Sequence, residues 1–139
     1  MNKRFWGQGS YPAWLAQALK FFAVGVLNTA VDLGLYFVLT HWLGISAAWK
    51  VGAKAISYSA GVFNSYYWNR SWTFKSRAQA GTTLIPFVIA NLVGLAVNAG
   101  VMGLCLNVLA WPEIVALGLA TGITLGWNFV VSKFVVFRK

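Results

Sequence analysis

Side chains able to do acid–base chemistry are scarce in this chain of 139 residues. The carboxylates are Asp32 and Glu113, and the single histidine is His41. Paired acid–base catalysis needs two titratable groups close together, and the sequence contains no Ser-His-Asp set, glycine-rich phosphate loop or metal-ligand spacing. We therefore expect no catalytic residue, no metal and no cofactor, and a protein that is not an enzyme.

Asp32 lies well inside a long apolar run, where an ionisable side chain costs roughly 2.5 to 3.5 kcal/mol on insertion scales. Asn28 lies one helical turn away on the same face, and Lys54 enters the next apolar run at a matching depth. We expect an Asp32–Lys54 pair. One interpretation is structural: Asp32 forms an ion pair, or it is protonated and hydrogen-bonded within the helix bundle. The other interpretation is a polar lining or a proton-sensitive gate.

Two further groups of residues lie inside apolar runs. Asn91 and Asn98 are two helical turns apart, so they share one face and either hydrogen-bond across a helix bundle or line a polar path. Gly118, Gly122 and Gly126 form a ridge of small residues that allows another helix to approach closely. The partner helix belongs either to this chain or to a second copy, and we expect self-association through this ridge.

The elements that carry these residues are membrane-spanning helices. Hydrophobic residues make up 59% of the chain and charged residues 9%, with a mean hydropathy of +0.66, outside the usual range of soluble domains. Charge-poor stretches near the roughly 20 residues that a span needs predict helices at about 20–42, 49–69, 83–108 and 113–132. The expected fold is an all-α integral membrane protein of four transmembrane helices, a single domain over residues 1–139.

Basic residues gather on one side of the predicted spans. Because loops rich in Lys and Arg stay in the cytoplasm, both termini are expected to be cytoplasmic, and the net charge of +9 reflects topology and not nucleic-acid binding. The residues on the expected cytoplasmic side are Lys3, Arg4, Lys20, Arg70, Lys75, Arg77, Lys133, Arg138 and Lys139, against Lys50 and Lys54 on the other.

An internal repeat relates the two halves of the chain. The segment SYYWNRSWTFK, residues 65–75, superposes on NFVVSKFVVFR, residues 128–138, with Arg70 on Lys133 and Lys75 on Arg138. Each segment follows an even-numbered span, which indicates a duplicated two-helix unit. Two parallel repeats of this kind are related by an axis along the membrane normal, so the two basic segments face one compartment.

The sequence resembles the GtrA-like family of small four-span proteins linked to bacterial surface-polysaccharide modification. The likeness covers nearly the whole chain and rests on FFAVGVLNTAVDLGLYFVL in the first span, SYYWNRSWTFK after the second and GWNFVVSKFVVFRK at the end. It implies that a polyprenyl-phosphate-linked sugar, typically undecaprenyl-phosphate glucose, is moved across the bacterial cytoplasmic membrane for use by a separate membrane glycosyltransferase. Ser65 stands where the family commonly has asparagine, although Asn64 is adjacent.

The repeat suggests where the lipid phosphate binds. Arg70 and Lys133 should lie at equivalent positions around the central axis, where Arg can grip phosphate oxygens with two parallel hydrogen bonds and Lys adds a point charge. Alternatively, both residues are anchors for any anionic lipid. The candidate site for the lipid phosphate comprises Arg70, Lys133, Lys75, Arg138, Asn69 and Asn128.

Two other functions remain open from the sequence. One is a proton-coupled exporter like the small multidrug-resistance proteins, in which Asp32 would exchange protons for a cationic drug. The other is a membrane subunit that transports nothing and recruits or stabilises a glycosyltransferase through the glycine ridge. The exporter leaves the duplicated basic segments unexplained.

Overall fold

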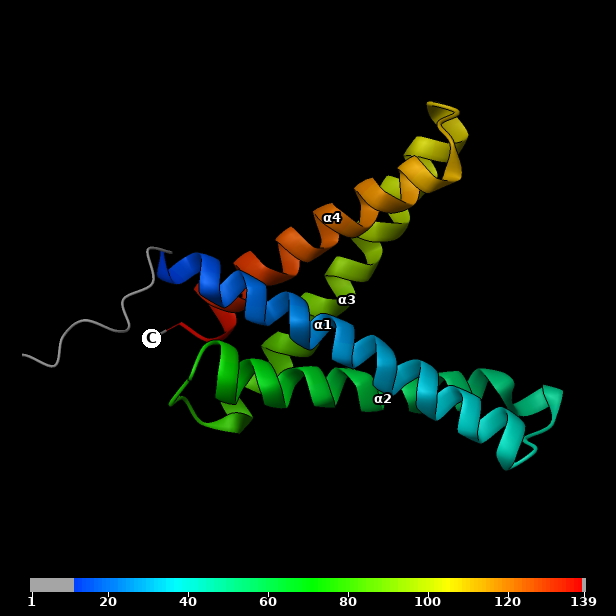
Figure 1. The fold of residues 1–139 in the computed structure, drawn as a ribbon, viewed down its shortest axis with the longest axis horizontal. Helices are drawn as coiled ribbons and strands as arrows, with labels where there is room; N and C mark the ends of the chain where they lie inside the picture. The colour runs from blue at the N-terminus through cyan, green and yellow to red at the C-terminus, as the bar shows by residue number, and fades with distance from the viewer. Residues whose placement is uncertain (1–11, 139) are drawn as a thin grey trace, which may run out of the picture.

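The computed structural model describes residues 12–138, and Lys3, Arg4 and Lys139 lie outside this range. Its secondary structure is all-helical, with four long helices joined into two hairpins (Figure 1). The long helices are α1 (Ala13–Phe37), α2 (Lys50–Trp68), α3 (Ala80–Gly103) and α4 (Glu113–Val131). A 3₁₀ turn, η2 (Ala47–Trp49), precedes α2.

Each long helix ends in five residues of π-helix. These turns are η1 (Val38–Trp42), η3 (Asn69–Thr73), η4 (Leu104–Val108) and η5 (Ser132–Val136). Under the shift that places Arg70 on Lys133, η3 superposes on η5 from its first residue to its last. The two halves of the chain therefore share the local backbone geometry as well as the sequence pattern.

Three of the four helical runs are long and apolar enough to cross a membrane: Ala13–Trp42, Ala80–Val108 and Glu113–Val136. The fourth run, Lys50–Thr73, reaches about 36 Å at about 1.5 Å per residue, which exceeds a hydrocarbon core of roughly 30 Å. It is less apolar because it carries Lys50, Lys54 and several serines and asparagines. Its membrane crossing stays a prediction.

Two helices begin earlier than hydropathy indicated, whereas α2 and α4 begin within one residue of their predicted starts. The first helix begins at Ala13, after Pro12, instead of near residue 20. The third helix begins at Ala80, before the predicted start at residue 83, so Pro86 lies inside α3. Gln17 and Lys20 interrupt the apolar pattern at the start of α1, and α3 begins with three weakly hydrophobic residues, so hydropathy alone underestimates the length of both helices.

The two hairpins diverge from one end of the molecule, the end where the C-terminus lies (Figure 1). Within a hairpin, α1 packs along α2 and α3 along α4; between hairpins, α1 contacts α4 and α2 contacts α3. If the two halves of the chain are exchanged, the contact of α1 with α4 becomes the contact of α3 with α2. This is the arrangement expected of two parallel repeats.

Aromatic side chains fill the junction between the hairpins. Phe74 and Phe137, which are equivalent in the repeat, stack with ring centroids 5.3 Å apart. Tyr66 lies 6.0 Å from Phe137, and its equivalent Phe129 lies 6.0 Å from Phe74. We call these four rings, together with Phe21 and Phe87, the aromatic cluster. Buried aromatic pairs of this kind contribute roughly 0.5–1.5 kcal/mol each beyond the area they bury.

Candidate functional site

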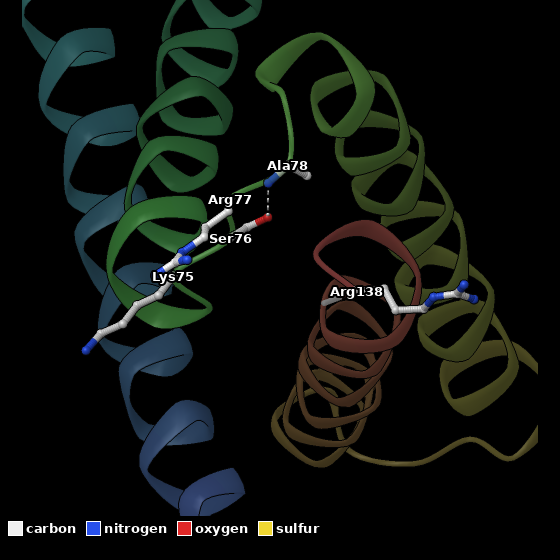
Figure 2. A pocket seen from close by; sticks show the side chains of 5 residues that line it. All are labelled: Lys75, Ser76, Arg77, Ala78 and Arg138. Carbon is white, nitrogen blue, oxygen red and sulfur yellow. Dashed lines mark hydrogen bonds between the residues drawn. The ribbon is translucent and has the colours of Figure 1, made fainter.

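A cavity of about 590 Å³, here called the basic cavity, lies at the end where the hairpins join. Figure 2 shows that four of its lining residues come from the segment after η3 and the fifth from the end of the chain. These residues are Lys75, Ser76, Arg77, Ala78 and Arg138. Lys75 and Arg138 are equivalent in the repeat, so both halves of the chain contribute a cation to the cavity, and Arg77 of the first half adds a third.

The cations of this cavity have no acidic partner among residues 12–138, where the ion pair formed is that of Asp32 with Lys54. The side chains of Lys75 and Arg138 point away from one another (Figure 2). Lys75 has a backbone φ of 49°, in the left-handed region that few residues other than glycine adopt. This conformation ends the helical run immediately before the cavity. The three cations give this cavity a positive charge, which favours an anionic ligand.

Arg70 and Lys133 have different surroundings in the two halves. One Nη of Arg70 donates a hydrogen bond to the carbonyl oxygen of Ala78, at 2.6 Å, so Arg70 holds the segment that lines the basic cavity. The ammonium of Lys133 lies over the rings of Phe129 and Phe134, 5.6 and 5.4 Å from their centroids. Neither residue lines the basic cavity, and their joint contact with a phosphate stays a prediction.

A second cavity, of about 280 Å³, lies between the hairpins and is lined by residues of all four helical runs. Its wall is uncharged, and we call it the amide cavity after its asparagines. The polar lining residues are Asn28, Thr29, Ser65, Asn69, Asn91, Thr121 and Asn128. The shift that relates the repeats places Asn28 on Asn91 and Ser65 on Asn128, so two positions of the repeat line the cavity from both halves.

The aromatic cluster separates the two cavities. Phe21 lines the amide cavity and packs against Phe74, with ring centroids 6.0 Å apart. Phe74 and Phe137 directly precede Lys75 and Arg138 of the basic cavity. The structure therefore contains a charged site and a neutral site on either side of one apolar layer.

Several polar atoms beside the amide cavity are buried without a partner. These atoms are Oδ1 of Asn28, Asn69 and Asn128, and Oγ of Ser132. Asn69 is 1% exposed, and its Nδ2 donates to Oγ of Ser65 at 3.1 Å. In Asn91, by contrast, Nδ2 donates to the carbonyl of Phe87 at 2.9 Å. Since nearly all buried polar groups in proteins are hydrogen-bonded, these unpaired atoms are exceptions, and they are covered by neighbouring atoms instead of facing the open cavity.

Two glycines allow the asparagines to lie against neighbouring helices. A Cβ at Gly61 of α2 would lie 2.6 Å from Oδ1 of Asn28, and a Cβ at Gly94 of α3 would lie 2.4 Å from Oδ1 of Asn128. Both distances are shorter than real Cβ contacts. Glycine at these positions therefore lets each amide lie flat against the next helix, which leaves the cavity open.

The predicted ion pair of Asp32 with Lys54 forms, away from both cavities. Nζ of Lys54 lies 2.7 Å from Oδ2 of Asp32, and Oγ of Ser57 donates to Oδ1 at 2.6 Å. Lys54 also lies 5.6 Å from the centroid of the Tyr36 ring. The equivalent positions in the second half are occupied by Leu95 and Leu117, so this polar network belongs to the first hairpin alone.

Two other sequence predictions receive a partial answer. Asn98 was predicted to share a helix face with Asn91, but only Asn91 lines the amide cavity. At Gly118, Gly122 and Gly126, an added Cβ would meet no described atom within 4 Å. No helix of residues 12–138 covers this ridge, and the predicted self-association through it remains a prediction.

Sequence reasoning did not find three residues that shape these sites. Arg77 was counted only as a topology residue, yet it lines the basic cavity. Gly61 and Gly94 were not singled out, since a glycine that makes room for a side chain on another helix leaves no local pattern. The repeat did carry a signal for the amide cavity, because its shift pairs Asn28 with Asn91.

Comparisons with known proteins agree with this architecture. A family model described as GtrA/DPMS, transmembrane domain, matches residues 20–137. A bactoprenol-linked glucose translocase of Shigella phage SfV is 29% identical over 127 residues, which cover 86% of this chain and 93% of the relative. A bactoprenol-linked glucose translocase of Salmonella phage P22 is 26% identical over 119 residues, which cover 86% of this chain and 92% of the relative. A membrane protein of Bacillus subtilis, YngA, described as uncharacterized, is 38% identical over 80 residues, 57% of this chain. That match spans about half of YngA, 51% of its length.

Proposed function

Because the chain belongs to the GtrA/DPMS transmembrane family, we propose that it moves a polyprenyl-phosphate-linked sugar, such as undecaprenyl-phosphate glucose, across the bacterial cytoplasmic membrane. The names of the phage relatives support this substrate class. A membrane glycosyltransferase would then use the sugar on the outer side. Both termini and the basic cavity would face the cytoplasm, where the lipid is loaded.

The observation that carries this proposal is the basic cavity at the junction of the hairpins. Lys75, Arg77 and Arg138 offer an anionic headgroup three cations that no described carboxylate neutralises. Arg can bind phosphate oxygens in a bidentate manner, whereas Lys supplies a point charge. Arg70 contributes by holding the carbonyl of Ala78. Lys133, Asn69 and Asn128 remain part of the proposed lipid-phosphate site.

The contacts of Asp32 argue against the exporter alternative. A proton-coupled exporter needs an acid that releases and regains a proton as cargo moves. Both carboxylate oxygens of Asp32 are held, one by Lys54 and the other by Ser57. This arrangement favours a structural role for the pair.

One observation favours a second candidate function, a membrane subunit that recruits a glycosyltransferase. The ridge of Gly118, Gly122 and Gly126 is uncovered in the described part of the chain, as an interface for another helix would be. The two functions differ in what the purified protein does alone. A translocase moves the lipid in liposomes that contain no transferase, and a recruiting subunit does not.

Reconstitution into liposomes with a labelled polyprenyl-phosphate sugar tests the proposal. We expect leaflet exchange above the protein-free rate, and a reduction of about tenfold or more in the Lys75→Gln/Arg138→Gln variant, since two charge-assisted hydrogen bonds are lost. Lys50→Gln is the matched control, because Lys50 is an exposed cation at the other end of the first hairpin. Wild-type protein that gives no exchange above the protein-free rate would contradict the proposal.

A further inference from the structure

We propose that a lateral groove of the first hairpin binds the polyprenyl chain of the lipid, with the phosphate end of the chain toward Lys20 and the basic cavity. This inference rests on the proposed function for the identity of the lipid. The groove lies between α1 and the helical run of α2 and η3, and its volume is about 280 Å³. We call it the tryptophan groove, and its lining residues are Ala23, Val24, Leu27, Trp68 and Trp72.

The tryptophan groove is open on the outer surface of the hairpin. Trp68 and Trp72 are one helical turn apart, so their rings lie on neighbouring turns of one helix face. Both rings and the side chain of Leu27 are exposed, whereas Val24 is 2% exposed. In a membrane, such an exposed apolar surface faces lipid. A lipid chain can therefore enter the groove sideways from the bilayer.

The groove has an apolar body and a cation at one end. Nζ of Lys20 lies 5.2 Å from the centroid of the Trp72 ring, and Lys20 lies one turn before Ala23 and Val24 on the same face of α1. Among residues 12–138 the ion pair formed is that of Asp32 with Lys54, so Lys20 has no carboxylate partner in this range. A polyprenyl phosphate has the same polarity, because its long apolar chain ends in an anion. The lipid and the groove therefore match in charge as well as in apolarity.

One lipid molecule can reach the tryptophan groove and the basic cavity at the same time. Trp72 of the groove and Lys75 of the cavity are three residues apart, so their Cα atoms are separated by at most about 11 Å, at about 3.8 Å per residue. Lys75 points away from Arg138 (Figure 2). The phosphate is ester-linked to the end of the chain, so the first isoprene units must continue directly from it. A phosphate at Lys75 and the following units at Trp72 meet this requirement.

Packing against the two indole rings would select a polyprenyl chain over an ordinary acyl chain. A chain that enters the groove from the bilayer only exchanges one apolar environment for another, so apolarity alone gives no preference. A polyprenyl chain carries rigid double bonds and methyl branches at regular intervals, so it loses less conformational freedom on binding than a saturated chain does. The indole rings offer flat, rigid surfaces to these planar units. The small volume of the groove restricts this recognition to a short part of the chain.

The repeat does not duplicate the groove. The shift that relates the two halves places Trp68 on Val131 and Trp72 on Val135, so the second hairpin has small aliphatic side chains at both positions. The same shift places Lys20 on Thr83, whose Oγ1 lies 2.7 Å from the hydroxyl of Tyr66 inside the junction. The cation and the two indole rings thus occur together in the first hairpin and are replaced together in the second.

Photocrosslinking of the wild-type protein in phospholipid nanodiscs tests the groove. The probe is undecaprenyl phosphate with a photoreactive group on its second or third isoprene unit, and crosslinked peptides are identified by mass spectrometry. We expect crosslinks in residues 23–27 and 68–72. An excess of unlabelled undecaprenyl phosphate should remove them, and the same excess of phosphatidylglycerol should not.

Affinities of variants measure what the two tryptophans contribute. The probes are undecaprenyl phosphate and a saturated alkyl phosphate with a short chain. Trp68→Leu/Trp72→Leu should bind undecaprenyl phosphate about tenfold more weakly, as the loss of two aromatic contacts would give. Its affinity for the alkyl phosphate should stay, which shows that the variant is folded. Trp14→Leu is the matched control, because Trp14 is an exposed tryptophan of α1 that lines neither the groove nor the basic cavity.

Three outcomes would overturn the inference. These are wild-type crosslinks outside the groove, equal competition by phosphatidylglycerol, and an affinity for undecaprenyl phosphate that falls no further in the double variant than in Trp14→Leu. If the double variant fails to fold, the crosslinks of the wild-type protein decide. Neither experiment requires a sugar or transport. Crosslinks in the groove without leaflet exchange would sustain the groove and contradict the proposed function, and exchange with crosslinks elsewhere would do the reverse.

Discussion

Replacement of Gly94 by alanine would place a methyl group against the amide of Asn128. The new Cβ would lie 2.4 Å from Oδ1 and 3.1 Å from Cγ and Nδ2, whereas ordinary contact begins at 3.4 Å. The amide oxygen must therefore retreat by about 1 Å. The space open to it is the amide cavity, which Asn128 already lines.

Two opposing effects set the change in stability. Overpacking of this kind typically costs about 1–3 kcal/mol, and alanine in place of glycine in a helix gains up to about 1 kcal/mol. We expect the free energy of unfolding to fall by up to about 2 kcal/mol. Asn128 also belongs to the proposed lipid-phosphate site, so its displacement should lower the affinity for polyprenyl-phosphate glucose about fivefold, as for one neutral hydrogen bond.

Thermal unfolding and lipid binding, measured in parallel, separate these effects. Gly118→Ala on α4 is the control, because it brings the same gain in helix propensity and its Cβ meets no described atom within 4 Å. It should melt at or above the wild-type temperature and bind normally. Adding Asn128→Ala to Gly94→Ala should recover stability, since the clash is removed and the two changes are coupled.

The reasoning is refuted if Gly94→Ala and Gly118→Ala melt at the same temperature and bind the glucosylated lipid equally well. Equal melting would mean that Asn128 does not pack on Gly94. Equal affinity alone, with the expected loss of stability, would mean that the amide of Asn128 does not contact the lipid headgroup.

Three further predictions concern topology, the ion pair and the junction. Reporter fusions should place the C-terminus in the cytoplasm and the α1–α2 connection outside it, and a periplasmic C-terminus would contradict the proposed orientation. Asp32→Asn and Lys54→Met should each lower the free energy of unfolding by about 1–3 kcal/mol, because each leaves one charge unpaired. The double variant should lose less than the sum, and a loss equal to the sum would show that the pair is not coupled. Phe137→Ala should lower the free energy of unfolding by about 3–5 kcal/mol. Phe134→Ala, at a position that is 60% exposed, should lower it by under about 1 kcal/mol. Equal losses would contradict the role given to the aromatic cluster.

Much of the fold follows from local sequence. Apolar runs specify the helices, and the repeat of residues 65–75 in residues 128–138 specifies two similar hairpins. The Asp32–Lys54 pair was also predictable, because a charge inside an apolar helix requires a nearby partner at the same depth. The helix ends were harder to predict, since the helices continue through polar residues such as Asn69 and Ser132 that hydropathy assigns to the boundary.

The sites depend on how the hairpins are placed, and sequence patterns do not encode this placement directly. Arg70 was a reasonable choice for a phosphate contact, yet its guanidinium bonds the carbonyl of Ala78, and the cavity forms one turn further along. The sequence pattern placed Asn91 and Asn98 on one helix face and gave no reason to assign them different roles. The placement of the hairpins distinguishes them, because only Asn91 lines the cavity that the first hairpin shares with the second.

The junction of the hairpins has the construction of a symmetric dimer. Phe74 meets its own counterpart Phe137, and the contact of α1 with α4 recurs as that of α3 with α2. In such an interface one surface meets its own copy. If the chain were cut between α2 and α3, the two hairpins would be separate polypeptides. Each hairpin would keep its complete interface surface, so the two could reassemble. The covalent connection has another role: it ensures that the hairpin with the Asp32–Lys54 pair joins the hairpin with the glycine ridge, and not a second copy of itself.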